Sequence, residues 1–280
     1  MSAILKINNF ISAFIDALKS IFYIRLWTPF FIFFLISIAF AYMILNPFSG
    51  PWSGFVTWIG ASSLFGGGEA FTHYPQHLLI SPSVHSHLNL VLSIIVDSLL
   101  TGAAFIIFAG FFRAQKVKFS EAVSRAFSSY HWLVLASAVI YAILYAVQLL
   151  LPEIFMQMLI GNPRRMFFFI VALKLFMFLV FSPLVYTIPY IVLKNENFFS
   201  AFLNSIRFFL KNIFTTFFAI FITQLVVLPF SLSLDYSGWI ADKFSPETIA
   251  VILYIEIFAA MIASFLLTAM LARFFIEYNE

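Results

Sequence analysis

Residues 198–212 read FFSAFLNSIRFFLKN, an apolar stretch in which four polar side chains recur at intervals of four, three and four residues. They are Ser200, Asn204, Arg207 and Lys211. Because an α-helix completes a turn about every 3.6 residues, this spacing places all four on one face of a helix. The stretch therefore predicts an amphipathic helix that lies along a surface and carries one polar stripe.

The composition around this stretch is that of an integral membrane protein. Of 280 residues, 63% are hydrophobic and 10% are charged, and the mean hydropathy is +1.03. Forty phenylalanines exceed what a water-soluble core of this length needs, whereas lipid-facing surfaces expose them without hydrophobic cost. The chain has no cysteine, which excludes disulfides, thiol nucleophiles and thiolate metal sites.

Apolar runs of roughly 20 residues are long enough to cross about 30 Å of hydrocarbon as a helix. The sequence predicts an all-α, polytopic membrane protein that forms one six-helix transmembrane domain over residues 1–280. Pro183 and Pro189 fall inside the fourth run and predict a kink there. The six predicted spans cover residues 27–46, 88–112, 131–151, 166–193, 212–233 and 248–275.

The basic residues predict how these spans are oriented. Under the positive-inside rule, the side of the membrane that carries most lysine and arginine is cytoplasmic. Only three bases, Arg164, Arg165 and Lys243, lie on the side predicted to be external, and Lys174 lies inside a span. Both termini are therefore expected in the cytoplasm of a bacterial cell, with the protein in the inner membrane. Eleven bases share the cytoplasmic side: Lys6, Lys19, Arg25, Arg113, Lys116, Lys118, Arg125, Lys194, Arg207, Lys211 and Arg273.

The amphipathic pattern occurs three times, each time just before a predicted span. ISAFIDALKS at 11–20 and FSEAVSRAFS at 119–128 align with FSAFLNSIRF at 199–208, with serine second and apolar residues first, fourth, fifth and eighth. This predicts three units, each a cytoplasmic amphipathic helix followed by a transmembrane hairpin. The apolar faces are expected in the membrane interface or against the bundle. True internal repetition and a pattern merely shared by interfacial helices both remain open.

The segment PLVYTIPYIVLKNENFFSAFLNSIRFFLKN, residues 183–212, resembles part of an uncharacterised group of bacterial six-helix membrane proteins. That group is related to the membrane domain of some glycerophosphodiester phosphodiesterases. The resemblance rests on Pro189, Lys194, Glu196, Ser205 and Arg207. It implies a six-helix fold and a membrane location. It does not imply phosphodiesterase activity, since the catalytic domain of those enzymes is a separate soluble barrel.

Three charged side chains, Asp97, Lys174 and Glu256, lie inside predicted spans. Charges in hydrocarbon are costly, so each is expected to have a partner or a function. They lie about eight or nine residues from the external ends of the second, fourth and sixth spans, at a similar depth. We expect them to meet, either as an exchangeable proton or cation site or as a fixed ion pair that specifies helix register. Gln148 and Gln224 are the expected polar neighbours.

The first external connection, residues 47–87, holds four of the five histidines. His73 and His77 have the spacing of two ligands of a zinc or copper ion on one helical face. His85 and His87 have the spacing of two such ligands on an extended segment. Pro75 interrupts the first pair, however, and a helix across it is not expected. A loop with neutral histidines and no metal is therefore the preferred interpretation.

Two functions from different classes fit these features. The first is a non-enzymatic accessory or scaffold protein that interacts with the lipid bilayer or with a partner membrane protein, without a cofactor and without nucleic acid. The second is a small proton- or cation-coupled transporter that uses Asp97, Lys174 and Glu256. No nucleophile motif or phosphate-binding loop occurs in the sequence, which favours the first.

Overall fold

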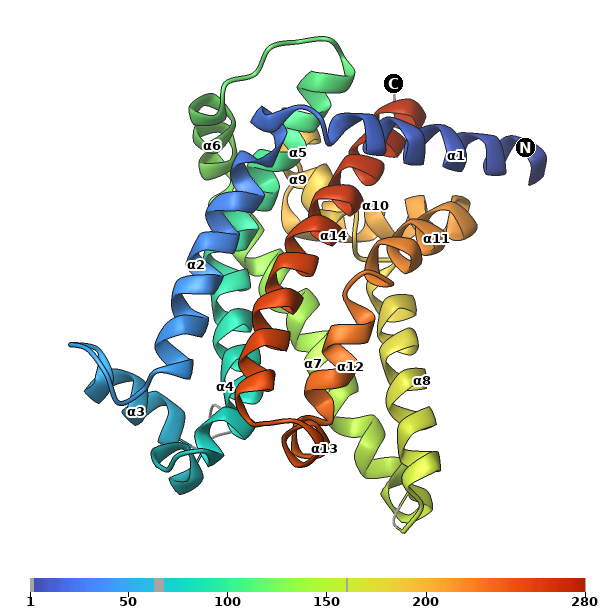
Figure 1. The fold of residues 1–280 in the computed structure, drawn as a ribbon. Helices are drawn as coiled ribbons and strands as arrows, with labels where there is room; N and C mark the ends of the chain where they lie inside the picture. The colour runs from blue at the N-terminus through green and yellow to red at the C-terminus, as the bar shows by residue number, and fades with distance from the viewer. Residues whose placement is uncertain (1–2, 63–67, 160, 280) are drawn as a thin grey trace. The chain divides into compact units, whose positions relative to one another are not determined.

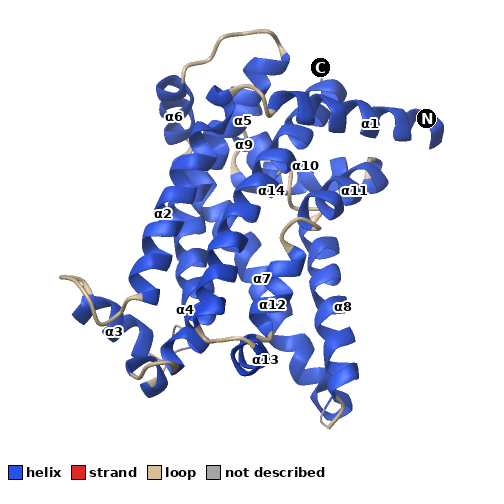
Figure 2. Cartoon of the chain, viewed as in Figure 1, coloured by secondary structure: helices blue, strands red, loops and turns tan. Residues whose placement is uncertain are grey.

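A computed structural model describes residues 3–62, 68–159 and 161–279, which form helices joined by turns (Figure 2). The chain is an all-α protein, as predicted. Within the described residues, four helical segments are long and apolar enough to cross a membrane, or five if α10 and α11 together count as one bent span. These candidate spans indicate a membrane location. The four are Ile24–Leu45, Gln76–Phe112, Tyr130–Phe155 and Glu247–Tyr278.

The chain divides into two compact units, and both are discontinuous in sequence. Unit 1 comprises Met1–Pro29, Ile94–Thr223 and Phe265–Glu280, and unit 2 comprises Phe30–Ser93 and Gln224–Ser264. The colours of Figure 1 follow the chain through both. The last helix, α14, contributes residues to each unit.

Unit 1 is built around two helical segments that are buried on nearly all sides. One is α5, which is almost fully buried from Leu100 to Gly110, and the other is the last part of α14, from Phe265 onward. Their rings meet where Phe108 packs edge-on against Phe265, with centroids 5.2 Å apart. The helices of unit 1 are α1 (Ala3–Ser20), η1 (Ile24–Trp27), α5 (Ser98–Phe112), α6 (Phe119–Ser128), α7 (Tyr130–Leu159), α8 (Pro163–Phe181), α9 (Thr187–Lys194), α10 (Phe198–Lys211), α11 (Ile213–Gln224) and the end of α14 (Glu247–Asn279).

A glycine allows neighbouring helices to approach α5 closely. A Cβ atom added to Gly102 would lie 3.0 Å from the Leu133 side chain of α7 and 3.2 Å from the Val192 side chain of α9. Those distances are shorter than ordinary van der Waals contact, so only glycine fits without displacing a neighbour. Close packing of this kind is typical of helices that associate in membranes.

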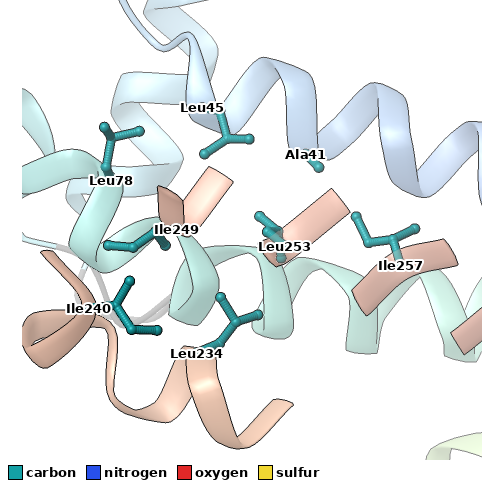
Figure 3. Close-up of a cluster of buried hydrophobic side chains, with 8 residues drawn as sticks. All are labelled: Ala41, Leu45, Leu78, Leu234, Ile240, Ile249, Leu253 and Ile257. Carbon is teal, nitrogen blue, oxygen red and sulfur yellow. The ribbon is translucent and has the colours of Figure 1, made fainter. Parts of the chain in front are cut away.

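Unit 2 has its own core, which Figure 3 shows. Side chains from α2, α4, α12, α13 and the first part of α14 bury one another there, and Ile249 and Leu253 are fully buried. A smaller cluster joins α3 to the start of α4 around Phe71. The helices of unit 2 are α2 (Thr28–Leu45), α3 (Ser53–Ala61), η3 (Glu69–Thr72), α4 (Gln76–Leu92), α12 (Leu228–Asp235), α13 (Ser237–Lys243) and the start of α14.

The run predicted as a span over residues 166–193 is two helices. The first, α8, ends at Phe181, turns occupy residues 182–186, and α9 begins at Thr187. Pro183 lies in the break, so the predicted interruption is confirmed at that residue. Pro189 lies in the first turn of α9, where the missing N–H of a proline is tolerated.

The run predicted over residues 212–233 is also divided. Helix α11 ends at Gln224 and α12 begins at Leu228, with Pro229 in its first turn. Proline cannot donate the backbone hydrogen bond that would continue α11, and it disfavours a helical conformation in the residue before it. In place of a straight fifth span, α11 pairs with α10 across a bend of 98° at residue 212.

Part of the segment predicted as the first external connection is helical. It contains α3 and η3, and α4 starts at Gln76, directly after Pro75. The expectation that no helix crosses Pro75 is confirmed, and the helical run that contains the predicted second span begins at Gln76, twelve residues before residue 88. The apolar helical run from Gln76 to Phe112 has 37 residues, well beyond the roughly 20 that hydrocarbon requires.

The three amphipathic stretches form α1, α6 and α10, all in unit 1. In the first and third, the buried positions coincide: Ala13 and Ala17 in α1, and Ala201 and Ser205 in α10. In α6 the buried pair occupies the fourth and eighth places of the alignment, which were predicted to be apolar, whereas the buried pairs of α1 and α10 occupy the third and seventh. Small residues therefore face the core in all three, with the second copy shifted by one residue.

Candidate functional site

Asp97, one of the three predicted intramembrane charges, belongs to a π-helical segment. This segment, Ser93–Asp97, interrupts the helical run between α4 and α5. A π-helical turn shifts the backbone hydrogen bonds by one residue, and two side chains donate to the Ile95 carbonyl within it. The Tyr130 hydroxyl donates to that carbonyl at 2.9 Å and the Ser98 hydroxyl at 3.3 Å. The irregular backbone is therefore supported by side chains from α7 and α5.

The Asp97 carboxylate itself is held on α5. Its Oδ1 atom accepts a hydrogen bond from the Thr101 hydroxyl at 3.2 Å, one turn later. The side chain is half-buried. A carboxylate in an apolar helix whose local geometry is irregular is a site where protonation or ion binding can be coupled to a change in structure.

The other two predicted members of the charge cluster lie in different units. Lys174 is half-buried on α8 in unit 1, and Glu256 is half-buried on α14 in unit 2. That the three charges meet stays a prediction. Of the expected polar neighbours, Gln148 is exposed on α7 and Gln224 is half-buried at the end of α11.

The break between α8 and α9 is closed by α10. The buried Ser205 hydroxyl donates to the Pro183 carbonyl at 2.7 Å and accepts from the Tyr186 N–H at 3.1 Å. Both are backbone groups that the interrupted helix leaves without their usual partners. The Tyr186 hydroxyl shares a hydrogen bond with the Thr216 hydroxyl of α11, 3.1 Å away. One serine of the amphipathic helix thus joins α10 to the break.

The predicted polar stripe of α10 is divided between two roles. Near the start of the helix, the Ser200 hydroxyl and the Asn204 amide both donate to the Glu196 carboxylate at 2.8 Å. Near its end, Arg207 and Lys211 are exposed. Glu196 therefore accepts hydrogen bonds from the two neutral side chains of the stripe, and the exposed part of the stripe is basic.

An apolar stripe is also exposed on α10 and continues onto α11. Its side chains are Phe199, Leu203, Leu210 and Phe214, which are 68%, 54%, 61% and 70% exposed. The buried face of α10 consists of Phe198, Ala201, Ser205 and Phe208. The apolar side predicted from the sequence is thus exposed at Phe199 and Leu203, and two phenylalanines and two small residues pack against the rest of unit 1.

Helix α1 carries a second exposed stripe, formed by Ile11, Ile15 and Leu18, and Phe22 extends it in the turn after the helix. Polar contacts attach this helix to the end of α14. Arg273 Nε donates to Asp16 Oδ2 at 3.1 Å, and the Asn9 amide donates to the Tyr278 hydroxyl at 2.8 Å. The Phe10 ring packs against Phe218 of α11, with centroids 6.3 Å apart. Both stripes therefore belong to connected helices of unit 1.

The histidines do not assemble at one point. His73 is exposed before α4 begins, and His87 Nδ1 lies 2.8 Å from the Ser83 carbonyl. His77 and His85 are buried, and His77 Nε2 lies 3.3 Å from the Leu45 carbonyl. Among the residues that the structure describes, no three histidine, aspartate or glutamate side chains are placed to hold a metal ion.

Comparisons with protein-family models, with curated proteins and with solved structures found nothing that matches this chain. The fold and the geometry above therefore define the class, an all-α protein with candidate membrane spans. The resemblance to the six-helix group remains a prediction.

Proposed function

We propose that this protein is a non-enzymatic integral membrane protein of a bacterial cytoplasmic membrane, in which surface helices of unit 1 lie in the lipid–water interface and serve an accessory or scaffold role. Its termini are cytoplasmic in this proposal, as the distribution of bases predicts. Six segments would cross the membrane if α8–α9 and α11–α12 do so as broken helices. Partner membrane proteins are expected at the same surface.

The observation that carries this proposal is the exposed apolar stripe of α10. Leucine and phenylalanine side chains exposed along one face of a short helix are unfavourable in water but stable at the boundary of a bilayer. At 14 residues, α10 is about 21 Å long and too short to cross the hydrocarbon. A helix of this length with apolar and basic faces suits the plane of the interface.

The chain contains no cysteine, so a single engineered one gives a unique label. Leu203→Cys, labelled with an environment-sensitive fluorophore in lipid nanodiscs, should emit at a shorter wavelength than the same label at the exposed Ser124 of α6. Equal, water-like emission from both positions would refute the interfacial placement of α10.

The second candidate is a proton- or cation-coupled carrier, and the observation that favours it is Asp97 in the π-helical segment. A carrier reconstituted in liposomes should dissipate an imposed proton or cation gradient faster than empty liposomes do. Asp97→Asn should abolish that flux while the protein still folds. Flux equal to that of empty liposomes would rule this candidate out.

A further inference from the structure

The charged residues within α10 and α11 themselves are both basic. Between Asn197 and Leu234 the only charged residues in the sequence are Arg207 and Lys211. Both are exposed, and they lie one turn before and one residue after Leu210. The nearest preceding acid, Glu196, already accepts from two side chains of α10. The side chains that α10 and α11 expose are therefore apolar or basic near this stripe.

Such a surface matches the chemistry of one leaflet of an anionic membrane. The apolar side chains match the acyl region, and the two bases can reach the phosphates above it by extending their aliphatic stems. The bend of 98° between α10 and α11 turns the chain away from the direction of α10 directly after Lys211. The bases therefore lie at the corner of the bent pair.

We propose that this corner binds anionic phospholipid headgroups in the leaflet in which the protein resides, with Arg207 and Lys211 donating to the phosphate oxygens. Leu203, Leu210 and Phe214 pack against the acyl chains of the same lipids. The inference rests on the proposed function, because it needs α10 in the interface. It adds a preference for negative lipid, which an interfacial helix does not require.

The experiment uses the protein labelled at Leu203→Cys, in nanodiscs of phosphatidylcholine and phosphatidylglycerol. A trace of acceptor-labelled lipid of either kind is included, and energy transfer from the protein to each acceptor is compared. Transfer to phosphatidylglycerol should exceed transfer to phosphatidylcholine, with each base contributing about fivefold to the local preference. Added salt should reduce the difference, since it screens exposed charges.

Arg207→Gln with Lys211→Gln should remove the preference, and Arg207→Gln alone should reduce it about fivefold. Arg164→Gln with Arg165→Gln on α8 is the matched control, because it removes the same charge from two exposed bases and should leave the preference intact. Equal energy transfer to both lipids would overturn the inference, and so would a control that loses the preference for phosphatidylglycerol as the Arg207 and Lys211 variant does. In either case, short-wavelength emission would still support the interfacial placement of α10. Water-like emission in both lipids would overturn the proposed function and this inference together.

Discussion

Ser205 provides the sharpest test of the packing in unit 1. Its hydroxyl satisfies both the Pro183 carbonyl and the Tyr186 N–H at the break between α8 and α9. In Ser205→Ala both backbone groups lose that partner in a region where Ser205 and Tyr186 are fully buried. A buried polar group without a partner costs about 1–3 kcal/mol. The variant should therefore lose about 2–4 kcal/mol of stability.

The assay is thermal unfolding of the purified protein in mild detergent. For a chain of this size about 1 kcal/mol corresponds to a few degrees, so the midpoint should fall by about 5–10 °C. Ser128→Ala is the matched control, because Ser128 is exposed and its hydroxyl donates only to the Arg125 carbonyl of its own helix. If Ser205→Ala unfolds within about 1 °C of the wild type, Ser205 does not support the break and the reasoning is refuted.

Three further changes test other contacts. Arg273→Gln should weaken the attachment of α1 through Asp16 by about 1 kcal/mol, since both side chains are partly solvated, and should speed proteolysis within α1. Gly102→Leu should cost about 1–3 kcal/mol by overpacking the contact of α5 with α7 and α9, measured by the thermal midpoint. The Tyr74 hydroxyl donates to Glu247, which raises the pKa of Tyr74 above its usual value. The stabilisation of the fold by this hydrogen bond is present below about pH 10 and is lost as pH rises through the raised pKa of Tyr74. The stability difference between wild type and Tyr74→Phe should therefore disappear in strong alkali.

Each of these changes has its own control. Gly54→Leu should leave the midpoint nearly unchanged, because no atom lies within 4 Å of an added Cβ there. Raised salt should reduce the effect of Arg273→Gln on proteolysis, as expected for a partly exposed ion pair. A difference between wild type and Tyr74→Phe that persists unchanged above the raised pKa would contradict the assignment of this hydrogen bond.

Hydropathy and proline were sufficient to predict part of this fold. Four of the six predicted spans overlap candidate spans of the structure, because long apolar runs have few alternatives to helix. The interruption at Pro183 was also predictable. The length of the run over residues 212–233 predicts one continuous helix, whereas Pro229 inside it is the signal for the break that the structure shows.

The faces of the amphipathic helices were only partly predictable. Spacing identified the polar stripe of α10, but hydropathy alone does not distinguish the apolar side chains that pack from those that remain exposed. Ala201 and Ser205 are buried beside Phe198 and Phe208, whereas Phe199 is exposed, so residue size alone does not decide which side chains pack. That choice depends on the shape of the neighbouring helices, which a single sequence does not contain.

The candidate sites show the same limit. Asp97 was identifiable as a charge in an apolar run, but the π-helical segment and its support by Tyr130 depend on contacts between residues 35 positions apart. Ser205 is identifiable from the sequence only as one of the residues that carry the resemblance to a family. Its two backbone partners exist because another helix is interrupted. Long-range contacts of this kind have no local signature.

The placement of α10 in the membrane interface, with a sharp bend of the chain into α11, underlies both the proposed function and the lipid preference. Spin labels at single cysteines from residue 198 to residue 224 would test it, with their accessibility to oxygen and to a water-soluble relaxation agent measured in liposomes. Oxygen accessibility along α10 should oscillate with a period near 3.6 residues and peak at Phe199, Leu203 and Leu210. A steady rise from 198 through 212, without oscillation, would show a helix crossing the bilayer and would contradict the account.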